Sequence, residues 1–117
     1  MHSLHDIRER SLSSRELVVQ YVDAIEALTI FQERGTRVLG WEGWLLHADG
    51  SVSPSHKYQG TADLESLSAS ASASASAAAI LAKATIMQAH TEWQERPEVH
   101  DAALYFCLTV EGCEDGA

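Results

Sequence analysis

The chain has 117 residues, of which 45% are hydrophobic and 21% charged, so it can bury one core and does not have the composition of a disordered protein. Seventeen acidic residues against eight basic ones give a formal net charge of −9, which disfavours a nucleic-acid partner because binding phosphates requires Lys and Arg. Two cysteines are too few for a disulfide scaffold and no stretch reaches the roughly 20 apolar residues of a membrane span, so we expect a cytoplasmic protein that does not associate with membranes.

The first twelve residues show no clear pattern, and we assign residues 1–12 to an N-terminal arm. A helix is predicted over residues 14–34 because Ser13 and Glu16 have the spacing of a capping box and Gly35 supplies a C-terminal stop. The apolar stripe of this helix would consist of Val18, Tyr21, Val22, Ile25 and Leu28.

Two strands are predicted over residues 36–47 and 52–59. Asp49-Gly50 lies between them, and Asp-Gly between strand-like runs is typical of a two-residue type I′ hairpin turn. If these two residues are the centre of the turn, the register is fixed. The expected cross-strand pairs are then Ala48–Ser51, Leu46–Ser53, Trp44–Ser55, Glu42–Lys57 and Trp41–Tyr58.

This register divides the hairpin into two faces, because neighbours along a strand point in opposite directions. Pro54 cannot donate to a ladder and marks the second strand as an edge, whereas the first strand is apolar on both faces and is predicted to be central. The core face would carry Leu39, Trp41, Leu45, Val52 and Tyr58. The opposite face would carry Val38, Glu42, Trp44 and Leu46 opposite Ser53, Ser55 and Lys57.

The remaining elements are a second helix and a third strand. Ser and Ala largely alternate over residues 68–79, and we expect the second half of this segment to begin a helix that ends near Arg96, before Pro97; residues 68–74 could instead be a low-complexity linker. A strand is predicted over residues 103–110. Together these elements form one α+β domain over residues 13–110, in the order helix, strand, strand, helix, strand, followed by an acidic tail over 111–117. A right-handed crossover places the three strands in a mostly antiparallel sheet in the order second, first, third, packed against two helices.

No catalytic motif, metal-ligand spacing or cofactor-binding motif is present, and we expect a protein that is not an enzyme and holds no metal or cofactor. Glu42 could act as a general acid or base between the two indoles, but an ion pair with Lys57 is the preferred interpretation. Trp44 could anchor an exposed apolar patch with Val38 and Leu46, or lie in a second, minor core under a helix.

The leading functional hypothesis is a protein-binding module that captures a basic partner protein through Trp44, Glu42, Leu46, Val38 and Lys57. In size and charge, though in no motif, the chain resembles small acidic bacterial proteins that neutralise a toxin or another enzyme, which implies an immunity-like or inhibitor protein. The docking surface depends on the predicted register, and a slip of one residue or a deeply buried Trp44 would remove it.

Two alternatives stay open. The Ala-rich helix or the apolar sheet face could make the chain a subunit of a homodimer or larger homo-oligomer. A small-ligand binder or an enzyme could be built around Glu42, His56 and Tyr58.

Overall fold

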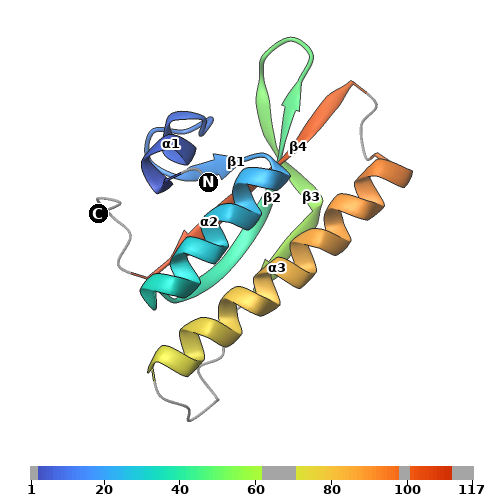
Figure 1. Cartoon of the computed structure of the whole chain (residues 1–117). Helices are drawn as coiled ribbons and strands as arrows, with labels where there is room; N and C mark the ends of the chain where they lie inside the picture. The colour runs from blue at the N-terminus through green and yellow to red at the C-terminus, as the bar shows by residue number, and fades with distance from the viewer. Residues whose placement is uncertain (1–2, 62–70, 98–100, 112–117) are drawn as a thin grey trace.

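The computed structural model describes residues 3–61, 71–97 and 101–111 and shows an α+β fold in which helices and an antiparallel sheet form two layers (Figure 1). Three helices and four strands lie within these ranges. In chain order they are α1 (Leu4–Glu9), β1 (Leu17–Val19), α2 (Tyr21–Arg34), β2 (Val38–His47), β3 (Val52–Thr61), α3 (Ala71–Glu95) and β4 (Ala102–Val110).

The four strands form one sheet in the order β1-β4-β2-β3, and every neighbouring pair is antiparallel. The predicted order of the three long strands is therefore confirmed, with β2 central and β3 at an edge. The sequence did not predict β1, which pairs with the side of β4 that the three-stranded sheet would have left open.

Helices α2 and α3 both pack on the same face of the sheet. Tyr21 of α2 and Trp41 of β2 each contact the ring of Phe106 on β4, and Trp41 Nε1 donates to Thr85 Oγ1 of α3 at 2.8 Å. The helices α2 and α3 do not lie on opposite sides of the sheet. Such an arrangement would have buried Trp44 in a second core. Within the described ranges, no helix combines the length and the apolar character that crossing a bilayer requires.

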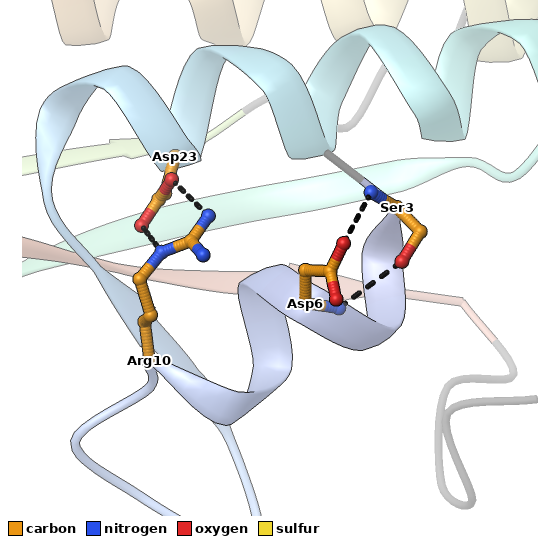
Figure 2. Close-up of polar contacts among 4 residues, drawn as sticks. All are labelled: Ser3, Asp6, Arg10 and Asp23. Carbon is orange, nitrogen blue, oxygen red and sulfur yellow. Dashed lines mark hydrogen bonds and ion pairs between the residues drawn. The ribbon is translucent and has the colours of Figure 1, made fainter. Parts of the chain in front are cut away.

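The N-terminal segment is part of this core. The capping box is formed by Ser3 and Asp6, whose side chains each accept from the other's backbone amide, and it begins α1 (Figure 2). Helix α1 places Leu4 and Ile7 in the main hydrophobic cluster. The assignment of residues 1–12 to an arm outside the domain therefore differs from what the structure shows for this helix.

The predicted start of the long N-terminal helix was wrong. Ser13 Oγ does accept from the amide of Glu16 at 3.1 Å, yet residues 17–19 form β1 and α2 begins only at Tyr21. Val18 and Val19 are β-branched and all three residues of the run Leu17-Val18-Val19 are buried, so pairing with β4 stabilises the run more than a helix would. The predicted end of the helix at Gly35 is confirmed.

An ion pair holds α1 against α2. Arg10 Nε and Nη2 each donate to an Asp23 carboxylate oxygen at 2.8 Å, in the bidentate geometry that planar guanidinium and carboxylate groups favour (Figure 2). The hydrogen bonds to Asp23 raise the pKa of Arg10. This contact fixes the chain segment that leads from α1 toward β1.

Helix α3 begins earlier than expected, at Ala71, so residues 71–74 are helical and not a linker. The part of the predicted linker over residues 68–70 lies outside the described residues. The strand predicted over 103–110 is confirmed as β4. Of the predicted acidic tail, Glu111 is described: its amide donates to the carbonyl of Arg37 at 2.8 Å, and residues 112–117 lie outside the described ranges.

The turn between β2 and β3 has three residues instead of two. The amide of His47 donates to the carbonyl of Ser51, and the amide of Gly50 donates to the carbonyl of His47. Of the three loop residues, Gly50 alone has a positive φ, at 90°. Hydrogen bonds from the Ser51 hydroxyl and amide to the Asp49 carboxylate lower the pKa of Asp49. This is a three-residue hairpin loop with glycine in the left-handed position, so the predicted two-residue turn was wrong.

The strand register differs accordingly. Near the turn it is one residue out of step with the prediction, and between Glu42 and Trp44 a bulge in β3 shifts it again. The bulge lies beside Gly43, where an added Cβ would be 2.9 Å from the carbonyl oxygen of Tyr58. The observed pairs are Leu46–Val52, Leu45–Ser53 and Trp44–Pro54 near the turn, then Glu42–Gln59, Trp41–Gly60 and Gly40–Thr61.

Candidate protein-docking face

The face of the sheet that points away from α2 and α3, here called the outer face, is covered by none of the described helices. The pairings of β2 with β3 and β4 place the following side chains on it: Glu42, Trp44, Leu46, Val52, Pro54, Ala103, Tyr105 and Thr109. Glu42, Val52 and Pro54 are exposed, whereas Trp44, Leu46 and Tyr105 are half-buried. The outer face is thus an aromatic and aliphatic surface bordered by a carboxylate.

Trp44 is the centre of this surface, because Pro54 on one neighbouring strand and Tyr105 on the other lie directly opposite it. Its Nε1 atom is buried, so the surface presents the ring and not the polar N–H group. A half-buried Trp flanked by an aromatic ring and a proline is typical of an interface anchor.

Two of the five predicted docking residues do not belong to the outer face. Val38 is fully buried in the main core, because the bulge between Val38 and Gly40 turns its side chain toward the helices. Lys57 lies in the bulge of β3, where its ammonium is 5.3 Å from the centre of the Tyr58 ring, and Glu42 pairs with Gln59 in place of Lys57. The predicted Glu42–Lys57 ion pair is therefore wrong, and the slip of one residue removes the docking surface in the form that the sequence predicted.

Glu42, Trp44 and Leu46 do share the outer face as predicted. Their side is set by β2 itself, because Trp41 and Leu45 are buried against the helices and alternate residues must point the other way. The slip of register changes their partners on β3: Val52, predicted to be in the core, and Pro54 replace Ser53, Ser55 and Lys57. The observed surface is more apolar than the predicted one.

Next to Trp44 the outer face has a small buried cluster of its own. Val18 of β1 and Glu42 of β2 lie opposite Cys107 of β4; Val18 and Cys107 are buried but do not belong to the main core. The Cys107 thiol donates to Glu16 Oε2 at 2.9 Å. Burial and this hydrogen bond raise the pKa of Cys107, which keeps the thiol protonated and unsuited to act as a nucleophile.

The cluster positions acidic groups at the border of the apolar surface. The Ser11 hydroxyl donates to the carbonyl of Glu16 at 2.8 Å and accepts from the amide of Val18, which holds the chain segment before β1 over the sheet. Glu16 and Glu42 are both exposed residues. None of the side chains named for the outer face is Lys or Arg, whereas at its edge Arg8 and Arg15 line a pocket together with Glu16 and Thr109.

The site imagined around Glu42, His56 and Tyr58 is not assembled. Tyr58 lies in the main core, where its ring contacts Trp93 of α3, whereas Glu42 is exposed on the opposite side of the sheet. The side chain of His56 lies outside the described part of the structure. Among the described residues, no three His, Cys, Asp or Glu side chains come close enough to hold a metal ion together.

A pocket of about 620 Å³ lies on the helix side of the fold, lined in part by Tyr21, His90 and Trp93. The rings of Tyr21 and His90 stack in parallel with centres 3.9 Å apart, and the two charged groups of the pocket, Arg10 and Asp23, bind each other. Its aromatic and charged side chains thus have partners within the fold, and no buried polar atom without a partner belongs to its lining.

Comparisons with protein-family models, with curated proteins and with solved structures find no match for the chain. The functional argument therefore rests on the outer face. Sequence reasoning found Glu42, Trp44 and Leu46 there but missed Val52, Tyr105 and Glu16. Tyr105 lies within the strand predicted over residues 103–110, so its place on one face of the sheet could have been predicted from that strand. Glu16 reaches the face only because β1 pairs with β4.

Proposed function

We propose that the chain is a small acidic protein-binding module that docks a basic partner protein on its outer face, as an immunity-like or inhibitor protein would. The observation that supports this most directly is Trp44, half-buried at the middle of a sheet face that no described helix covers. Exposed apolar surface of this kind is typical of protein interaction sites, since a sheet face without a function is usually polar or covered.

The charge of the partner follows from the border of the face. Glu42 and Glu16 are exposed beside Trp44, and the chain as a whole carries a net charge of −9. An acidic surface attracts basic partners over distances of about 10 Å at moderate salt, which raises the association rate more than the affinity. An Arg side chain of the partner would find both a carboxylate and an aromatic ring here.

The mode of action that this arrangement favours is occlusion. Among the described residues of the outer face, the thiol of Cys107 is buried and protonated and is therefore not an activated nucleophile. A cytoplasmic inhibitor needs only to cover the functional surface of its target, and for a nuclease-like or otherwise basic target an acidic cover is the complementary one. Toxin neutralisation is the biological role that we propose for such a cover.

The test is affinity capture with matched variants. The wild-type chain, Trp44→Ala and Glu42→Lys are used as bait in a lysate of the organism that encodes the chain, with Val22→Ala at an exposed residue of α2 as the control. We expect a basic protein that wild type and Val22→Ala retain and that Trp44→Ala and Glu42→Lys lose. The purified partner should then bind in a one-to-one complex whose association rate falls steeply with salt.

A partner that all four baits retain equally would refute the outer face as the docking site. An acidic or neutral partner whose binding does not depend on salt would refute the electrostatic part of the proposal.

A further inference from the structure

Helix α3 carries a second apolar surface that the proposed function does not use. Three of the six large hydrophobic side chains that are exposed in the described part of the chain belong to it: Ile80 at 56%, Leu81 at 36% and Met87 at 51%. With Ala84, Gln88 and Thr91, which are also exposed, they recur at helical spacing on the side of α3 that faces away from the core. We call these six residues the α3 stripe.

The α3 stripe is uncharged because the charged side chains of α3 point elsewhere. Lys83 Nζ donates to Gln32 Oε1 of α2 at 3.2 Å, and Glu92 lines a small pocket together with Lys57 and Tyr58 of β3. The next charged residue on the exposed side is Glu95, a full turn beyond Thr91. On a chain with a net charge of −9, the α3 stripe is therefore a surface on which a second acidic molecule meets little repulsion.

We propose that the α3 stripe is a self-association face, on which α3 of a second copy of this chain packs antiparallel. A two-fold axis beside Ala84 brings Leu81 of each copy opposite Met87 of the other. Ala84 then meets its own counterpart, and its small side chain allows the two helix axes to approach closely. The two-fold axis therefore sets the apolar residues of one copy against the apolar residues of the other.

The interface is of limited size. Residues 80–91 extend over about 17 Å of helix. This stretch is too short to bury the roughly 800 Å² per partner that is found in a standard interface. We therefore expect a reversible dimer with a dissociation constant on the order of 10–100 μM.

Sedimentation velocity over a wide concentration range is the first test, with Ala84→Glu compared with Val22→Glu. Both variants add one carboxylate at an exposed apolar or small residue, but Val22 lies on α2 and outside the α3 stripe. Because the two-fold axis sets the new carboxylates of Ala84→Glu against each other, we expect its dimer to weaken at least tenfold more than that of Val22→Glu. Circular dichroism of both monomers verifies that they are folded.

Raising the salt concentration should strengthen the wild-type dimer, because it screens the repulsion between two molecules of the same charge. Disulfide cross-linking in a Cys113→Ser background tests the direction of the helices. Ala84→Cys should form a dimer on mild oxidation and Thr91→Cys should not, since only residue 84 meets its own counterpart in the antiparallel arrangement.

A wild-type chain that stays monomeric at all concentrations would overturn the proposal. So would equal weakening by the two charge variants, or equal cross-linking at positions 84 and 91, which indicates parallel helices. Capture of a different protein that Ala84→Glu loses while the chain itself stays monomeric would assign the α3 stripe to that protein. None of these results bears on the outer face, whose own test uses Trp44 and Glu42.

Discussion

Gly43 is the residue on which the shape of the outer face depends most directly, and Gly43→Ala tests that dependence. The added Cβ would be 2.9 Å from the Tyr58 carbonyl oxygen, 3.0 Å from Tyr58 Cβ and 3.2 Å from Leu104 Cδ1. The Tyr58 atoms belong to the β3 main chain or are fixed to it, so no rotamer change relieves the contact and the bulge itself must move. Overpacking of this kind costs about 1–3 kcal/mol.

Part of this cost is offset, because Ala lowers the conformational entropy of the unfolded chain by an amount worth about 0.5–1 kcal/mol. We expect Gly43→Ala to lose about 1–2 kcal/mol of unfolding free energy, which corresponds to a fall in Tm of roughly 4–8 °C for a domain of this size. Urea unfolding followed by far-UV circular dichroism and Trp fluorescence measures the loss, and the m-value should not change.

Gly50 provides the control, because its surroundings are open but its φ is 90°. Asn tolerates a positive φ better than Ala, so Gly50→Asn should be milder than Gly50→Ala. At Gly43 the order reverses, because Asn is larger. The reasoning fails if Gly43→Ala is as stable as wild type within about 0.5 kcal/mol, or if Gly43→Asn is the milder variant.

Three further predictions test the rest of the fold. Tyr58→Phe should be as stable as wild type or up to about 1 kcal/mol more stable in urea unfolding, because the buried Tyr58 hydroxyl has no partner among the described residues; a loss above about 1 kcal/mol would show that it has one. Ile7→Ala should cost about 2–4 kcal/mol, because α1 is part of the core, whereas Leu12→Ala, at an exposed residue, should cost less than about 1 kcal/mol; equal losses would place α1 outside the core. The raised pKa of Cys107 means that the folded state keeps its thiol proton, so stability is intact below pH of about 8.5 and falls by up to about 1.4 kcal/mol per pH unit above it. In a Cys113→Ser background, Cys107→Ala should flatten this decline between about pH 8.5 and 10, and an unchanged slope would contradict the assignment.

The sequence predicted the long elements and the sheet order, because their apolar patterns are long enough to exclude other structures. It misplaced the start of the N-terminal helix because a capping box is a local signal. The hydrogen bond from the Glu16 amide to Ser13 forms, but Leu17-Val18-Val19 gains more from burial and from pairing with β4. A partner ninety residues away along the chain is invisible to a local pattern.

The hairpin register could not be read for a related reason. Asp49-Gly50 fits a two-residue turn with two positive φ angles and a three-residue turn with one, and only packing between the strands decides between them. By contrast, the side to which Trp44 points was predictable, because it depends on the burial of Trp41 and Leu45 in the same strand. That is why the predicted Glu42–Lys57 pair was lost while the aromatic anchor stayed on the outer face.

The two proposed surfaces lie on opposite sides of the molecule, since α3 packs on the face of the sheet that the outer face does not share. A dimer formed through the α3 stripe therefore leaves both outer faces free and can hold two partner molecules. Salt acts on the two contacts in opposite directions, because it screens attraction at the acidic outer face and repulsion between the two acidic copies. At low salt the chain should bind its basic partner as a monomer.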